Sequence, residues 1–142
     1  DLKIYGHSNG SADFFVIKSS HSNPLDNGDF DAIPTTSGSW GSGDMSGVVT
    51  KYSSEVTSWS TSGYNTISLN ASALSDMASL STFKICLIEA DYDLPDSEPS
   101  LGVDDMTGMR YEDYSSTSSD PYIDYTVAAV VTDNAIFFGS NF

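Results

Sequence analysis

One apolar run, residues 83–88, constrains the fold of this chain more than any other feature, and carboxylates follow it directly. Ile85 and Leu87 alternate with Cys86 and Ile88, so both faces of an extended strand are apolar near its middle. This pattern is typical of a central strand that is covered on both sides. The sequence therefore predicts that the run lies at the centre of a sheet and leads into the most acidic part of the chain.

Short runs rich in β-branched and aromatic residues recur along the chain, and clusters of Ser, Gly, Asn and Asp separate them. Such spacing is typical of antiparallel all-β domains. Besides the run at 83–88, it predicts strands at 2–5, 12–18, 48–50, 64–69, 106–114 and 122–131, and a last strand or docking segment at 134–139. The predicted fold is an all-β, antiparallel β-sandwich of jelly-roll type.

Two local signals add detail to this fold. The Asn-Gly pair at 9–10 lies between the first two predicted strands and favours an antiparallel hairpin. Leu74, Met77 and Leu80 recur at helical spacing after Asn70, which is a good N-cap residue. We therefore expect one short helix, with its apolar stripe covering an end of the sheet.

The charge balance excludes several classes of partner. The chain has 20 Asp and Glu residues against five Lys and Arg, which gives a net charge of −15. A surface of this kind repels nucleic-acid phosphates and anionic membranes. No window is long and apolar enough for a transmembrane helix. We expect no nucleic-acid binding and no membrane insertion, whereas divalent cations and neutral partners remain open.

Nothing in the sequence indicates catalysis. The two histidines, His7 and His21, lie in Ser/Asn/Gly loops, and neither belongs to a nucleophile motif. No phosphate-binding loop or zinc-ligand spacing is present. The single cysteine, Cys86, excludes an internal disulfide and is expected to be a buried structural thiol. We predict a protein without enzymatic activity.

Two stretches carry a family resemblance. Residues 111–114, Tyr-Glu-Asp-Tyr, precede a Ser/Thr-rich turn and then residues 120–126, Asp-Pro-Tyr-Ile-Asp-Tyr-Thr. Residues 63–70, Gly-Tyr-Asn-Thr-Ile-Ser-Leu-Asn, follow a Trp-bearing turn. Together they resemble DNRLRE-type domains over residues 1–127. The resemblance implies a β-sandwich module of secreted, cell-surface and viral structural proteins, lectin-like in shape.

The chain departs from that family at both ends. Such domains usually have further strands before the one that resembles residues 2–5, and residues 128–142 lie outside the family pattern. We therefore expect a sandwich domain at 1–127 and a C-terminal strand or tail at 128–142 that docks on a neighbouring subunit. The residues expected to take part in this assembly are Leu2, Ile4, Ile136, Phe137 and Phe138.

The acidic loop after the central run is the best candidate for a cation site. Hard oxygen ligands at alternating positions in a loop suit Ca²⁺, although the spacing is not that of an EF-hand. The alternative is a set of solvated carboxylates in the loops of an acidic protein. The candidate ligands are Asp91, Asp93, Asp96, Asp104 and Asp105.

Aromatic residues in loops suggest a second kind of site. Trp40, Trp59 and Tyr92 have flat apolar faces on which a sugar can stack. Core packing explains such residues equally well. Glycans are therefore a candidate ligand beside the candidate cation.

These features predict a non-enzymatic structural or interaction module of a virion component (a capsid decoration, a protrusion, or a tail or fibre) or of an extracellular appendage. It is expected to associate with itself or with neighbouring structural subunits, through sheet edges and the tail. The alternative is a carbohydrate-binding or adhesion module of a larger secreted or cell-surface protein. Either function places the chain outside the cell or on a virion surface.

Overall fold

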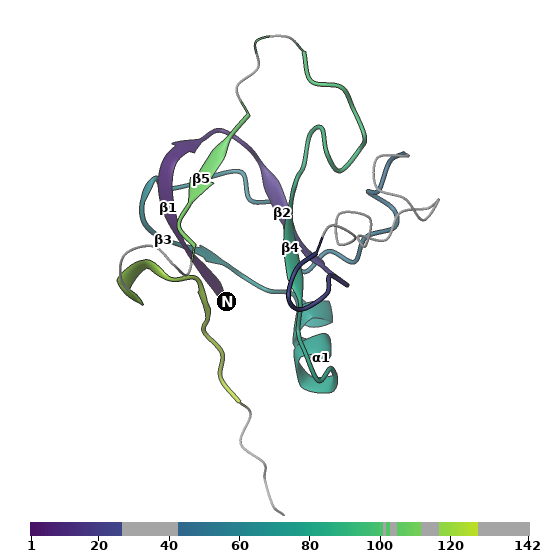
Figure 1. Ribbon diagram of the computed structural model, residues 1–142, viewed down its shortest axis with the longest axis vertical. Coiled ribbons are helices and arrows are strands. Elements are labelled where there is room, and N and C mark those ends of the chain that lie inside the picture. Colours follow the sequence, from purple (N-terminus) through teal and green to yellow (C-terminus); the bar gives the residue numbers. More distant parts are fainter. Residues whose placement is uncertain (27–42, 101, 103–104, 112–116, 128–142) are drawn as a thin grey trace, which may run out of the picture.

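The computed structural model describes residues 1–26, 43–100, 102, 105–111 and 117–127. This part of the chain is all-β, with antiparallel sheets and one short helix, which confirms the predicted fold class (Figure 1). The helix is α1 (Ala71–Ser79), and a 3-10 turn, η2 (Thr117–Ser119), follows later in the chain. The strands are β1 (Leu2–Gly10), β2 (Phe14–Lys18), β3 (Ser62–Ile67), β4 (Ile85–Glu89), β5 (Thr107–Met109) and β6 (Tyr122–Ile123).

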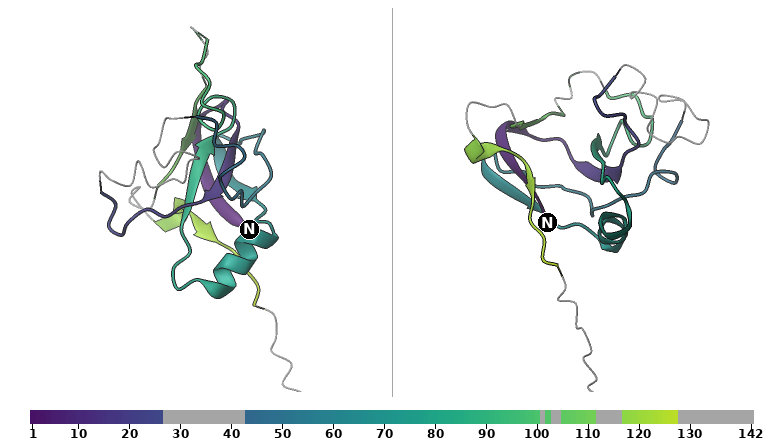
Figure 2. Two further views of the ribbon diagram at one scale, coloured as in Figure 1. Left: turned by 90° about the vertical axis from the view of Figure 1, so that its right-hand side faces the viewer. Right: turned by 60° about the horizontal axis from the view of Figure 1, so that its bottom comes forward.

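The described strands form two sheets. In the first sheet, β1 is central, with β3 on one side and β5 and β6 on the other (Figures 1 and 2). The second sheet pairs β2 with β4, and Phe15 lies opposite Ile88. The two sheets do not close into a sandwich within the described residues. The finer assignment to a jelly roll is therefore not established by these strands.

The predicted hairpin of the first two strands is wrong, because β1 and β2 belong to different sheets. Ser8 and Asn9 have positive φ angles of 48° and 42°, but they bend β1 and do not reverse it. The strand continues to Gly10, which lies opposite Thr107 of β5 after a register shift. Long-range pairing with β5 therefore overrides the local turn signal.

Two apolar cores lie on opposite faces of the β2–β4 sheet. Side chains alternate along both strands, so Val16 and Leu87 contact the core between the sheets, whereas Ile17 and Ile88 contact the other core. The buried residues of the first core are Leu2, Ile4, Phe14, Val16, Tyr52, Ile67 and Ala73. Those of the second are Ile17, Met45, Val49, Ile88 and Leu94.

The prediction that the run at 83–88 has apolar packing on both faces is confirmed by these two cores. Its predicted central position is not found in the described sheet, where β4 pairs only with β2. The middle position belongs to β2, because Phe14 and Ile17 also form bridges to Val56 and Lys51 on its other side.

The predicted helix is confirmed, with Asn70 as its N-cap: the Asn70 side chain accepts hydrogen bonds from the backbone N–H groups of Ser72 and Ala73. The predicted apolar stripe is wrong. Leu74 and Leu80 are 53% and 42% exposed, whereas the small residue Ala73 is buried in the first core.

A polar contact explains how this helix docks. Asp76 accepts hydrogen bonds from the Lys18 ammonium group (2.9 Å) and from the Tyr52 hydroxyl (2.5 Å). These partners come from β2 and from the segment that lies beside it. The helix therefore packs through the face that carries Ala73 and Asp76, which hydrophobic spacing alone does not indicate.

Several other strands differ in length from their predictions. The strand predicted at 64–69 is found as β3, shifted toward the N-terminus. Residues 46–48 form a turn, and the strand predicted at 48–50 is reduced to a bridge at Lys51. Within the described residues, the strands predicted at 106–114 and 122–131 are found as β5 and β6, and β6 pairs with the first two residues of β1; residues 112–114 and 128–131 lie outside the described part of the chain. The segment predicted at 134–139 lies outside the described residues.

Candidate functional site

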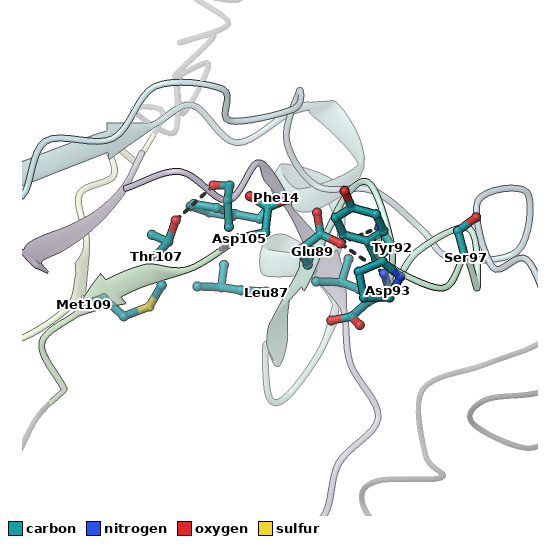
Figure 3. A pocket seen from close by; sticks show the side chains of 12 residues that line it. Phe14, Leu87, Glu89, Tyr92, Asp93, Ser97, Asp105, Thr107 and Met109 are labelled. Carbon is teal, nitrogen blue, oxygen red and sulfur yellow. Dashed lines mark hydrogen bonds between the residues drawn. The ribbon is translucent and has the colours of Figure 1, made fainter. Parts of the chain in front are cut away.

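An open pocket of about 460 Å³ lies where β4 and β5 approach each other (Figure 3). Phe14, Leu87 and Met109 are part of its apolar lining, and all three belong to or pack against the first core. Carboxylates also line this pocket, among them Glu89 and Asp105. It therefore combines an apolar surface with a concentration of negative charge.

Glu89 ends β4 and organises the turn that follows. Its carboxylate accepts hydrogen bonds from the backbone N–H groups of Asp91 (2.7 Å), Tyr92 (2.5 Å) and Asp93 (3.0 Å). Because Glu89 and Leu87 are two residues apart on one strand, they lie on the same face of the sheet, toward the pocket. The end of the apolar run thus fixes the position of the acidic loop.

Three carboxylates come together at this turn. One oxygen each from Glu89, Asp91 and Asp105 lies within 4.8 Å of the others. Ca²⁺ binds its oxygen ligands at about 2.3–2.6 Å, so two ligands of one ion lie at most about 5 Å apart. The spacing therefore fits a single cation, for which further oxygens would complete the coordination.

Burial and crowding raise the pKa of two aspartates at this turn. Burial, followed by the charges of Glu89, Asp91 and Asp13, raises the pKa of Asp105 above its ordinary value. Burial and the charge of Glu89 likewise raise the pKa of Asp93. The charged form of each carboxylate is therefore less stable at this site than it is in water.

The structure places the predicted calcium ligands differently. Asp91 and Asp105 belong to the three-carboxylate cluster, whereas Asp93 lines the pocket beside Glu89. Asp96 is exposed, with a positive φ of 55°, and is not part of the cluster; Asp104 lies outside the described residues. Glu89 is not among the predicted ligands, although strand alternation places it on the face of Leu87. Calcium binding stays a prediction.

Of the aromatic residues predicted to stack on sugars, Trp59 has other contacts. The Trp59 ring packs edge-to-face against Phe14 at 5.3 Å, and its indole N–H donates to the carbonyl oxygen of Gly108 (3.1 Å). These contacts give Trp59 a packing role. Tyr92 is half-buried at the pocket, and Trp40 lies outside the described residues.

A different set of aromatic rings lies on the face of the first sheet that is turned away from the core. Tyr64 packs edge-to-face against Tyr5 at 5.3 Å and against Tyr122 at 5.2 Å. The Arg110 guanidinium lies 5.3 Å from the centre of the Tyr5 ring. The register of β1, β3 and β6 brings these residues together, and no local pattern in the sequence indicates the group.

The predicted assembly residues separate into two groups. Leu2 and Ile4 are buried in the first core, and β1 has strand partners on both sides, so the structure gives them a packing role. Ile136, Phe137 and Phe138 lie outside the described residues.

Two reactive side chains have ordinary surroundings. Burial raises the pKa of the Cys86 thiol, which packs against the second core and is therefore a poor nucleophile. The Ser19 hydroxyl lies 2.7 Å from His21 Nδ1, a local contact between residues two positions apart. Among the described residues, no carboxylate hydrogen-bonds to that histidine ring.

Comparisons with protein-family models, curated proteins and solved structures found no match for this chain. Within the described part of the chain, no helix has the length and apolar character needed to span a membrane.

Proposed function

We propose that this chain is a non-enzymatic structural or interaction module that associates with neighbouring subunits through its sheet edges and its C-terminal tail. The observation that supports this function is the pair of sheets that do not close. Among the described strands, β3 and β4 each lie at the edge of a sheet with a partner on one side only. Unpaired strand edges are templates for pairing with another chain.

The same incomplete sheets underlie our proposal for the full architecture. We propose a jelly-roll sandwich related to DNRLRE-type domains, completed by strands that the described sheets lack. Two sheets already face each other across a common core, with β1 central in one and β2–β4 forming the other. Added strands at the open edges would extend both sheets while keeping that core.

We assign the module to a virion component or an extracellular appendage such as a fibre. Its composition supports this setting, because a net charge of −15 with only five basic residues keeps the free chain soluble and limits binding to nucleic acid. The residues of the pocket and the cores then have structural roles.

Sedimentation velocity over a wide range of chain concentrations tests this function, with electron microscopy of the heaviest fractions. We expect reversible, concentration-dependent association into regular oligomers or fibres. A single monomeric species at every concentration would contradict the proposed function.

A carbohydrate-binding or adhesion module is the second candidate, and the aromatic face of the first sheet favours it. Tyr122 is 48% exposed beside Tyr64, so both rings are accessible for stacking on a sugar. A glycan array on the wild-type chain and on Tyr122→Ala tests this function. It predicts saturable binding that the substitution abolishes, whereas a purely structural subunit gives no saturable binding.

A further inference from the structure

The outer edge of β4 directs backbone groups away from β2. Ala90 N–H donates to the Asp13 carbonyl and Ser19 N–H donates to the Lys84 carbonyl, so the alternate residues Cys86 and Ile88 direct their backbone groups toward β2. The N–H and C=O groups of Ile85 and Leu87 therefore point to the opposite side, where the Leu87 carbonyl oxygen accepts a hydrogen bond from the Cys86 thiol (3.3 Å). No described strand pairs with that side.

The composition of β4 is unusual for an edge. Edge strands are commonly protected by a charged residue, a proline or a bulge. Between the charged residues Lys84 and Glu89, the strand has none of these, and its side chains pack against a core on each face. Even so, Ile85, Cys86 and Leu87 are only half-buried. Both faces and the free edge are suited to one more strand.

We propose that residues 134–139 of a neighbouring copy occupy this edge as an added strand. This inference rests on the proposed assembly function and names the edge and the segment involved. In an extended segment, Phe137 lies on one face, and Ile136 and Phe138 lie on the other. An acceptor strand between two apolar cores requires a donor that is apolar on both faces.

The pocket beside β4 supports this occupant. It lies on the face of Leu87 and has an apolar lining from Phe14, Leu87 and Met109 (Figure 3). In strand addition, main-chain hydrogen bonds supply affinity, and pockets for alternate side chains supply specificity. An aromatic side chain of the added strand would fill this apolar surface, which the described residues leave open.

The exit of the chain points to a neighbouring copy. After β6, Asp124 still exchanges backbone hydrogen bonds with Asp1, and residues 125–127 then run away from both sheets (Figure 1). Tyr125 and Val127 are 64% and 75% exposed, so the chain leaves the described body through solvent. Fifteen residues follow Val127, which is enough for a linker and a six-residue strand.

A complementation experiment with two full-length variants tests the pairing. The Phe137→Asp variant has a disrupted tail segment, which is the strand donor, and keeps the β4 edge, which is the strand acceptor. Leu87→Pro removes an N–H that points away from β2, so it blocks the acceptor while the β2 ladder is retained. Phe142→Asp places the same charge elsewhere in the tail and is the matched control.

We expect the wild type and Phe142→Asp to associate, and each of the other two variants to be monomeric alone. Mixed together, Phe137→Asp and Leu87→Pro should form one-to-one heterodimers and nothing larger. If both variants associate as the wild type does, or if the mixture forms no heterodimer, the inference is wrong although the proposed assembly function stands. A wild type that is monomeric at all concentrations rejects both.

A second measurement applies if Leu87→Pro does not fold. Isotope-labelled Phe137→Asp is mixed with unlabelled wild type, and exchange of the Leu87 amide hydrogen is followed. We expect exchange to become slower by a factor on the order of 100 when wild type is present, because hydrogen-bonded amides exchange through opening. An unchanged rate overturns the inference.

Discussion

Strands β1 and β4 differ in their apolar content and in their position within a sheet, and the less apolar strand is the central one. β1 contains Gly6, Gly10 and several polar residues, yet it is central, with three partner strands. β4 is far more apolar, yet it is an edge in the described sheet. The apolar content of a strand thus reports how many of its faces are covered, and it does not report how many neighbours pair with its backbone.

The surroundings of the two sheets explain the difference. β1 buries Leu2 and Ile4 on one face and directs Tyr5 to the other, where the Tyr64 ring packs against it. The β2–β4 sheet has a core on each face. β4 therefore needs apolar side chains on both faces whatever pairs with its edge.

The largest effect is expected from the second core, which lies on the face of the β2–β4 sheet opposite the first core. Ile17 is fully buried there, so Ile17→Ala should lower the free energy of unfolding by about 3 kcal/mol. Urea denaturation measures this loss. Leu74→Ala is the control, because its exposed side chain should cost less than about 0.5 kcal/mol. Equal costs would contradict the second core.

The central position of β1 predicts the next effect. A Cβ atom on Gly6 would lie 1.7 Å from the Ser60 carbonyl oxygen, which is backbone and cannot rotate away. Gly6→Ala should therefore destabilise the chain by about 2 kcal/mol through overpacking. Gly47→Ala, where no atom lies within 4 Å of the added Cβ, is the matched control for the same thermal denaturation. A Gly6→Ala variant as stable as the wild type would show that β1 has room for a side chain beside Ser60.

A smaller, pH-dependent effect is expected where the helix joins the β2–β4 sheet. Hydrogen bonds from Tyr52 and Lys18 lower the pKa of Asp76 below 3.8. A lowered pKa in the folded state means that this group stabilises the fold above about pH 3.8, and that the contribution is lost as the pH falls through the lowered value. Asp76→Asn should therefore be less stable than the wild type at pH 7, with the difference vanishing in acid. A difference that does not depend on pH would reject the assigned hydrogen bonds.

The smallest effect concerns the acidic end of β4. The pKa of Asp105 is raised, so its charge destabilises the fold above the raised value, and the penalty disappears below about pH 3.8. Asp105→Asn should raise the midpoint of thermal unfolding slightly at pH 7 and leave it unchanged in acid. Lower stability at pH 7 would show that this charge has a stabilising partner.

Calcium titration by calorimetry tests the predicted cation site at the same turn. The prediction requires saturable heat from the wild type and none from the Asp91→Ala, Asp93→Ala double variant. No heat from the wild type rejects the site.

Local signals predicted the features that depend on neighbouring residues. The Asn70 cap and the apolar spacing that follows it predicted α1, and the apolar run from 83 to 88 predicted the two covered faces of β4. Features set by distant residues were predicted incorrectly. The helix docks through Asp76 and Lys18, which are 58 positions apart, and β1 pairs with β5 instead of forming a hairpin.

The candidate site follows the same division. Its acidic loop was evident from the sequence, but Glu89 and Asp105 come together only because β4 and the segment before β5 approach each other. The group of Tyr5, Tyr64 and Tyr122 likewise depends on strand register. No spacing along the chain could reveal either group.

Amide hydrogen exchange along β4 of the full chain tests the central claim most directly, in dilute solution and in the assembled state. Cys86 and Ile88 should be protected in both states, because their N–H groups face β2. Ile85 and Leu87 should exchange rapidly in the dilute state and become protected on assembly, because the added strand pairs with them. Two results would contradict an edge that is completed by a neighbouring copy. One is rapid exchange of the Ile85 and Leu87 amides in the assembled state, and the other is protection of these amides at the highest dilution that equals their protection on assembly.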